Sequence, residues 1–140
     1  MNCLVTGGAG FIASHLVDRL LHDGHKVRVY DNLSAGSLEN LADHEEDEKM
    51  EVYHADIRDL DKLTSAMEGC DFVFHLAADP IIFGGFQRRV SPIENNILGT
   101  YNVLEAMISC NVRKRHQERI SCQAESSASR YLHPRTMVLS

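Results

Sequence analysis

A run of small residues between an apolar segment and an amphipathic one constrains the fold of this chain most. Residues 2–6 form the apolar segment, Gly7 and Gly10 follow it, and residues 11–21 carry apolar side chains at helical spacing. This order predicts a buried strand, a tight turn and a helix that starts at the turn. Gly7 permits a turn that a side chain would block, and Gly10 lets a ligand approach the backbone closely.

The start of this predicted helix is suited to an anion. Its first backbone N–H groups have no partner inside the helix, and the helix dipole places partial positive charge there. Phe11 and Ile12 open the helix, and Ala13 takes the third small position of the pattern. We therefore expect the pyrophosphate of a dinucleotide at this turn; the alternative is a plain strand–turn–helix that binds no ligand.

Apolar runs and amphipathic segments alternate along most of the chain. Ile12, Leu16 and Leu20 lie on one face of the first helix. The alternation predicts an α/β fold with a doubly wound parallel (Rossmann) sheet, strand order 3-2-1-4, and helices on both faces of the sheet. We expect strands at 2–6, 26–31, 51–55 and 71–76, and helices at 11–21, 37–41, from Asp59 or Asp61 to Met67, and from Ile93 to about Asn111 with a stripe of Ile97, Tyr101, Leu104 and Ile108.

Polar residues follow the second predicted strand, at the edge of the sheet where a cofactor would lie. Asp31 ends that strand, and its carboxylate can accept hydrogen bonds from the hydroxyls of an adenosine ribose. The same negative charge would repel a 2′-phosphate, so NAD is favoured over NADP. Asn32 could add a polar contact, although a solvated strand-end carboxylate remains the alternative for Asp31.

The third and fourth predicted strands end at the same edge. Asp56 and Ile57 follow the third strand, and Asp56 could contact the amino edge of adenine or simply cap a helix. His75 is expected to be a buried strand residue rather than a catalytic one. The remaining candidates for cofactor contact are Leu76, Ala77 and Ala78, where small side chains allow close backbone approach, and Asn96, whose amide could reach back to the crevice from the long helix.

Composition excludes several classes of protein. The 140 residues carry 14 basic and 20 acidic side chains, a net charge of −6, which disfavours nonspecific binding to nucleic acid or to an anionic membrane. None of the four cysteines forms a Cys-x-x-Cys pair, so neither a disulfide framework nor a metal site is expected. The chain shows no secretory signal and no membrane span, so we expect a cytoplasmic protein.

Five motifs in order resemble a known family. They stand at 6–12, 31–34, 56–59, 75–78 and 96–100, and they are similar to those of the extended short-chain dehydrogenase/reductase family. The closest group is the NAD-dependent sugar-nucleotide epimerases and dehydratases, above all the UDP-glucose 4-epimerase type. The resemblance covers residues 1 to about 114. It implies NAD as cofactor, a nucleotide-sugar substrate for the full-length protein, and a homodimer formed through helices that include 92–111 and another beyond this chain.

The same resemblance implies catalysis by a Tyr-x-x-x-Lys pair, in which the lysine lowers the pKa of the tyrosine that acts as general base. Tyr131 is followed four positions later by Arg135, and no lysine occurs after Lys114. We therefore assign no catalytic residue and expect a cofactor-binding portion that is inactive alone. The alternatives are a non-catalytic NAD-binding sensor or interaction module, and an enzyme completed by another chain.

The alternation of apolar runs and amphipathic segments stops near Lys114. Residues 1–114 carry 10 basic and 18 acidic side chains, a net charge of −8, whereas residues 115–140 carry 4 and 2, a net charge of +2. This divides the chain into a binding domain, 1–114, and an aberrant or disordered tail, 115–140, with residues 120–122 as the only candidate fifth strand. One set of codons for residues 134–140 reads Glu-Asp-Tyr-Gly-Pro-Leu in another frame, which supports a frame shift near residue 115. Without a fifth strand, 71–76 would form an exposed sheet edge and the chain would be marginally stable.

Overall fold

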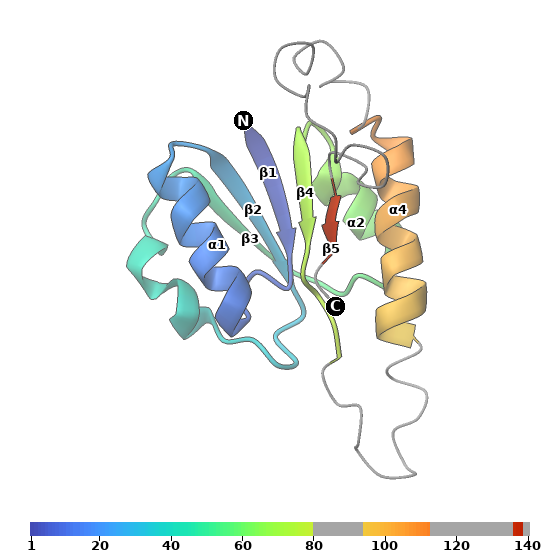
Figure 1. Ribbon diagram of the computed structural model, residues 1–140, viewed down its shortest axis with the longest axis horizontal. Helices are drawn as coiled ribbons and strands as arrows, with labels where there is room; N and C mark the ends of the chain where they lie inside the picture. The colour runs from blue at the N-terminus through green and yellow to red at the C-terminus, as the bar shows by residue number, and fades with distance from the viewer. Residues whose placement is uncertain (80–93, 113–135, 139–140) are drawn as a thin grey trace, which may run out of the picture.

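A five-stranded parallel sheet forms the centre of the molecule (Figure 1). The computed structural model describes residues 1–79, 94–112 and 136–138. The strand order β3-β2-β1-β4-β5 contains the predicted order 3-2-1-4, so the doubly wound arrangement is confirmed. The strands are β1 (Asn2–Thr6), β2 (Lys26–Asp31), β3 (Met50–His54), β4 (Phe72–His75) and β5 (Thr136–Val138).

Helices connect these strands, and local residues set where several of them start and end. Ser37 and Asp59 accept hydrogen bonds from the backbone N–H groups of Glu39 and Lys62, and these bonds cap two of the predicted helices. Gly24 lies after the first helix with a φ of +82°, the left-handed conformation that glycine adopts without strain. The elements are α1 (Phe11–His22), η1 (Leu38–His44), α2 (Leu60–Met67), the π-helix η3 (Glu94–Gly99) and α4 (Thr100–Ser109).

Hydrophobic residues fill both faces of the sheet because successive side chains of a strand point to opposite sides. Cys3 and Val5 of β1 pack in the cluster that includes α1. Leu4, between them, packs in the cluster that includes α2 and α4. Helices therefore cover the sheet on both sides, and its carboxyl edge is left for a functional site.

The buried helix faces differ from the predicted ones. On α1 the buried apolar side chains are Ala13, Val17, Leu20 and Leu21, whereas Ile12 is 70% exposed. On the long helix, the apolar stripe that was predicted to be buried faces outward. Three other residues, Val103, Ala106 and Met107, are buried against the sheet instead. Both sides of that helix are apolar, so periodicity in the sequence alone did not distinguish the core side from the outer side. Residues exposed on this stripe are Ile97, Tyr101, Leu104 and Ile108.

The fifth strand corrects the expectation that β4 forms an edge of the sheet. β5 pairs in parallel with β4, with Val73 opposite Thr136 and His75 opposite Val138. Three residues of the segment expected to be an irregular tail are therefore part of the sheet. A three-residue strand is too short to show an alternating pattern, which is why the sequence did not indicate it. The candidate strand at 120–122 lies outside the described residues.

None of the helices within residues 1–79 and 94–112 is long and apolar enough to span a bilayer.

The third strand begins one residue earlier than predicted and the fourth is two residues shorter. The parallel pairing of the strands nevertheless places the carboxyl ends of β1, β2, β3 and β4 side by side.

Candidate cofactor-binding site

The turn after β1 is packed directly against the end of β4. Gly7 has a φ of +70° and donates its N–H to the carbonyl oxygen of Tyr30 at 2.8 Å. A Cβ atom on Gly7 would lie 2.7 Å from the backbone nitrogen of Ala77. Glycine is therefore required here both by the backbone conformation and by the neighbouring strand.

The start of α1 has the properties of an anion site. Gly10 is its N-cap residue, no side chain caps the helix, and no acidic residue lies in its first turn. Phe11 and Ile12, which open the helix, are 77% and 70% exposed. Among the residues that the structure describes, no side chain thus competes as an acceptor for the first N–H groups of the helix, which fits the phosphates of a dinucleotide.

Asp31 holds the glycine loop from the end of β2. Its carboxylate is buried and accepts hydrogen bonds from the N–H groups of Ala9 at 3.0 Å and Leu33 at 2.8 Å. The second bond stabilises Leu33 in a left-handed conformation, with a φ of +57°. A carboxylate has about four acceptor positions, so about two remain for the donors of a ligand.

The carbonyl of Ala9 anchors the same loop from the opposite direction. Its oxygen accepts the backbone N–H of Ser37 at 3.1 Å and the side-chain amide of Asn40 at 2.8 Å. The sequence analysis did not identify Asn40, because nothing in its surroundings indicates a contact 31 residues away. Together with the bond to Asp31, these bonds hold both the backbone N–H and the carbonyl group of Ala9.

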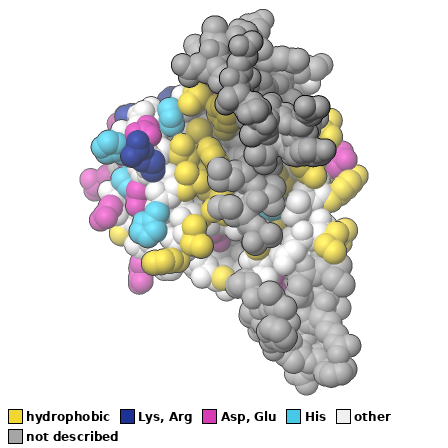
Figure 2. Space-filling model, in the orientation of Figure 1, with side chains coloured by type: hydrophobic (Ala, Val, Ile, Leu, Met, Phe, Trp, Pro, Cys, Tyr) yellow, Lys and Arg dark blue, Asp and Glu magenta, His cyan; other side chains and the backbone are white. Residues whose placement is uncertain are grey.

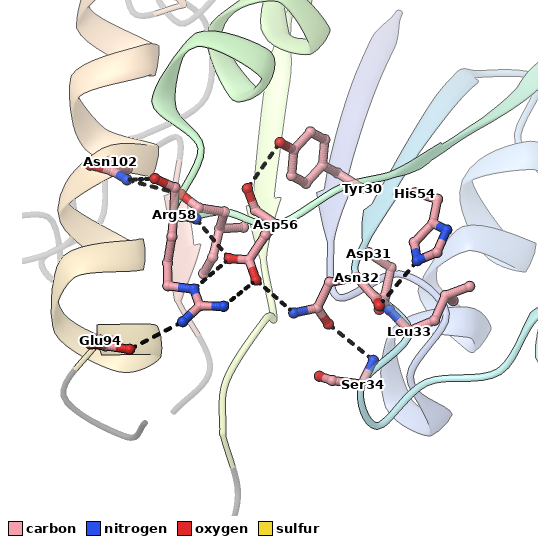
Figure 3. A network of polar contacts seen from close by, with 11 residues as sticks. Tyr30, Asp31, Asn32, Leu33, Ser34, His54, Asp56, Arg58, Glu94 and Asn102 are labelled. Carbon is pink, nitrogen blue, oxygen red and sulfur yellow. Dashed lines mark hydrogen bonds and ion pairs between the residues drawn. The ribbon is translucent and has the colours of Figure 1, made fainter. Parts of the chain in front are cut away.

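A polar network joins the ends of β2 and β3 to the long helix (Figure 3). Asp56 forms a two-pronged contact with Arg58, whose Nε and Nη2 lie 2.9 Å and 2.8 Å from the two carboxylate oxygens. Arg58 also donates to Glu94 at 3.1 Å. Asn32 donates its side-chain amide to Asp56 at 3.0 Å and accepts the N–H of Ser34. Arg58 belongs to the motif at 56–59, but its pairing with Glu94 could not be predicted, because the two residues are 36 positions apart in the sequence.

This network keeps Asp56 ionised. Hydrogen bonds from Arg58 are the main cause of a pKa well below the usual range, and Asn32 adds to the effect. The carboxylate accepts four hydrogen bonds, which uses its whole capacity. An adenine amino group would therefore have to replace one of these donors to bind Asp56.

Ile57 stands between Asp56 and Arg58 in the sequence, and its side chain is buried. Its carbonyl oxygen accepts the side-chain amide of Asn102 at 3.1 Å. Gly99 packs so closely that a Cβ there would overlap the Cδ1 atom of Ile57. The position of Ile57 is therefore set by two residues of the long helix: Gly99, which belongs to the motif at 96–100, and Asn102, which no sequence motif includes.

The end of β4 carries the remaining predicted residues. Leu76 and Ala77 are partly buried, and Ala78 is exposed. Asn96 does reach this edge, where its side chain accepts the N–H of Asp79 at 2.7 Å and donates to the Asp79 carbonyl at 3.3 Å. The structure thus brings the predicted residues of all four strand ends, and Asn96, to one edge of the sheet.

His75 is buried, as expected, and lies between two threonines. Its Nδ1 is 2.7 Å from Thr6 Oγ1, and its Nε2 is 2.9 Å from Thr100 Oγ1. Burial lowers the pKa of its imidazole. Within the described ranges, no group of three or more histidine, cysteine or acidic side chains is arranged to hold a metal ion.

The chain is similar to known proteins over most of its length. Residues 3–130 match the model of the NAD dependent epimerase/dehydratase family. UDP-glucose 4-epimerase of Mycolicibacterium smegmatis is 43% identical over 116 residues, which cover 81% of this chain and 37% of that protein. The enzyme of the same name from Halalkalibacterium halodurans is 38% identical over 117 residues, covering 81% and 33%. The chain thus spans about a third of the length of these curated relatives.

Solved structures agree with the sequence relatives. UDP-glucose 4-epimerase of Thermus thermophilus, in complex with NAD, superposes with a TM-score of 0.69 at 36% identity, covering 80% of this chain and 35% of that one. The fold, the motifs and the similarity over most of the chain confirm the resemblance predicted from the sequence. The chain belongs to the NAD dependent epimerase/dehydratase family.

Proposed function

We propose that residues 1–114 bind NAD and form the cofactor-binding portion of a nucleotide-sugar epimerase or dehydratase. The observation that carries this proposal is the uncapped start of α1 beside the buried carboxylate of Asp31. The N–H groups at the start of α1 would bind the pyrophosphate, and Gly7 and Gly10 would admit it. Asp31 would accept the adenosine ribose hydroxyls, which disfavours NADP because of its 2′-phosphate.

The remaining residues would complete the contacts. Phe11 and Ile12 are exposed beside the anion site and would cover the cofactor. Asn32, Asp56 and Ile57 would surround adenine. The side-chain amide of Asn32 is the donor on Asp56 that a ligand can replace most readily, because the other three donors belong to Arg58, which also binds Glu94. Leu76, Ala77, Ala78 and Asn96 would line the nicotinamide half. NAD supplies hydride transfer in such reactions, and the protein supplies its position.

The 140-residue chain alone is not expected to turn over a nucleotide sugar. None of its four tyrosines is followed by lysine at the fourth position, and the curated relatives that it matches extend well beyond the region it covers. The proposed substrate class, a nucleotide sugar, therefore refers to the longer family protein.

The alternative that another chain completes the enzyme is tested by adding a separately produced C-terminal half to the epimerase assay.

The outward stripe on the long helix supports pairing with a second copy. Ile97, Tyr101, Leu104 and Ile108 are each at least 45% exposed. Figure 2 shows hydrophobic side chains at the edge formed by α4, whereas charged side chains gather on the α1 side. We propose this stripe as the part of the family dimer surface that this chain contains, the other part being a helix beyond it. The stripe alone is expected to pair weakly, so light scattering at high concentration should show more dimer for the natural chain than for Tyr101→Glu; equal dimer fractions for the two contradict the proposal.

Calorimetric titration of the folded chain with NAD and with NADP tests the cofactor proposal. We expect heat with NAD and binding of NADP at least tenfold weaker, a difference of about 1.4 kcal/mol. An epimerase assay under the same conditions should show no turnover. Absence of heat with both cofactors, on material whose circular dichroism shows the α/β fold, would contradict the proposal.

A further inference from the structure

His75 lies at the centre of a chain of hydrogen bonds that joins three segments around the proposed cofactor cleft. Thr6, immediately before Gly7, contacts one ring nitrogen, and Thr100, at the start of α4, contacts the other. Thr6 and His75 are 0% and 3% exposed, so water does not satisfy them. Each proton in this chain must therefore be placed on a protein acceptor.

The direction of the bonds at Thr100 follows from its second partner. Its Oγ1 lies 2.8 Å from the carbonyl oxygen of Asn96, which can only accept. The single hydroxyl proton of Thr100 is used there, so its oxygen accepts from His75. The Nε2 atom of His75 must then carry a proton.

The direction at Thr6 follows in the same way. The backbone N–H of Ala77 can only donate, and it lies 3.4 Å from Thr6 Oγ1. The hydroxyl proton of Thr6 then needs an acceptor, and the unprotonated Nδ1 of His75, 2.7 Å away, supplies it. A protonated Nδ1 would leave the Thr6 proton without an acceptor among the residues that the structure describes.

These bonds connect the parts that form the cleft. Thr6 sets the start of the glycine loop, and Ala77 is the residue on which Gly7 packs. Thr100 holds the carbonyl of Asn96, whose side chain in turn binds the backbone of Asp79. His75 is the one side chain that contacts both threonines in this chain of bonds.

We propose that His75, as the neutral imidazole with its proton on Nε2, is a positioning residue that holds the glycine loop, the end of β4 and the start of α4 in their cofactor-binding geometry. Its relevance to NAD rests on the proposed function, whereas its effect on the loop does not. If His75 contributed to packing alone, an aromatic ring of similar size could replace it.

The first test is the tautomer of the natural chain. Nitrogen NMR of the 15N-histidine-labelled protein at about pH 7.5, about one unit above the ordinary pKa of histidine, should show that the ring of His75 is protonated at Nε2 and unprotonated at Nδ1. This histidine is assigned by its absence in His75→Phe. A protonated Nδ1, or a doubly protonated ring, would overturn the proposal.

The second test compares Thr100→Val, which removes the hydroxyl at nearly constant shape, with Thr100→Ser, which retains it. Amide hydrogen exchange should be about tenfold faster at Ala9 and Asp79 in Thr100→Val and in His75→Phe, since a local opening made easier by about 1.4 kcal/mol corresponds to that factor. Val29, in the middle of β2, should keep its rate, and Thr100→Ser should restore the natural rates. Equal acceleration at all three amides, or none, would show a packing role only and overturn the proposal.

The third measurement separates this inference from the function on which it rests. NAD affinity should fall about tenfold in Thr100→Val and recover in Thr100→Ser. If the natural chain binds no NAD while the tautomer and the local exchange are as expected, the proposed function fails and the positioning role stands. If NAD binds but the variants change neither affinity nor exchange, the positioning role fails and the proposed function stands.

Discussion

The carboxylate of Asp31, at the end of β2, accepts the backbone N–H of Ala9, in the glycine loop, at 3.0 Å. The residue that we propose for cofactor recognition thus also shapes the glycine loop, where we propose that the phosphates bind. Its burial means that this bond is not exchanged with water in the folded chain. A change at Asp31 should therefore alter both stability and cofactor binding.

Asp31→Asn tests this double role. Asparagine has one acceptor oxygen, so either Ala9 or Leu33 would face an NH₂ group, and we expect a loss of about 1–3 kcal/mol in the free energy of unfolding. NAD binding should weaken at least tenfold because the loop and the ribose contact are both affected. Urea denaturation and calorimetry measure the two effects. Asp43→Asn, an exposed position, is the control, and equal behaviour of the two variants would contradict the role of Asp31.

Gly7→Ala should be more harmful than its backbone conformation alone explains. Gly7 and Gly24 both have a positive φ, and alanine in the left-handed region costs about 1–2 kcal/mol. A Cβ at Gly24 would meet nothing within 4 Å, whereas at Gly7 it would meet the backbone of Ala77. Gly24→Ala is therefore a matched control that should retain NAD binding, while Gly7→Ala should abolish it. Similar unfolding midpoints and affinities for the two would rule out the clash.

Gly99→Ala should disturb Ile57, and a second substitution should repair the damage. Gly99 has helical dihedral angles, so alanine by itself would favour the helix by about 1 kcal/mol. The added Cβ would instead overlap Ile57 Cδ1, so we expect a net loss of stability. Ile57→Ala removes that Cδ1 atom and also the Cγ1 atom, which would lie 2.8 Å from the added Cβ. In this background Gly99→Ala should be neutral or stabilising, and a double-mutant cycle with no coupling would disprove the contact.

The pH dependence of stability should report the network around Asp56. Its pKa is lower in the folded chain than in the unfolded chain, where it is about 3.9, so the unfolded state binds the proton first as the pH falls. The contribution of Asp56 to stability is therefore fully present above about pH 5 and decreases as the pH falls through and below about 4. Asp56→Asn should be less stable at neutral pH and lose less stability between about pH 5 and 3. An unchanged dependence in urea titrations would contradict the network.

The gene sequence downstream of codon 114 tests the frame-shift hypothesis. We expect another reading frame there to encode a strand followed by a Tyr-x-x-x-Lys pair. If no frame encodes them, the hypothesis fails. The pairing of β5 with β4 is a separate matter, because it supplies a neighbour to β4 whatever the origin of residues 136–138.

The sequence alone was sufficient for the glycine turn, the order of the first four strands, and the grouping of Asp31, Asp56, Ala77 and Asn96 at one edge. These features depend on local rules, since glycine positions, hydrophobic periodicity and parallel topology are all readable along the chain. Only the tertiary structure decided the contacts that hold these residues, such as Arg58 with Glu94 and His75 with its two threonines. It also decided which apolar face of α4 is buried and that residues 136–138 complete the sheet. Such contacts join residues tens of positions apart, and their geometry depends on how whole helices pack, which no local pattern encodes.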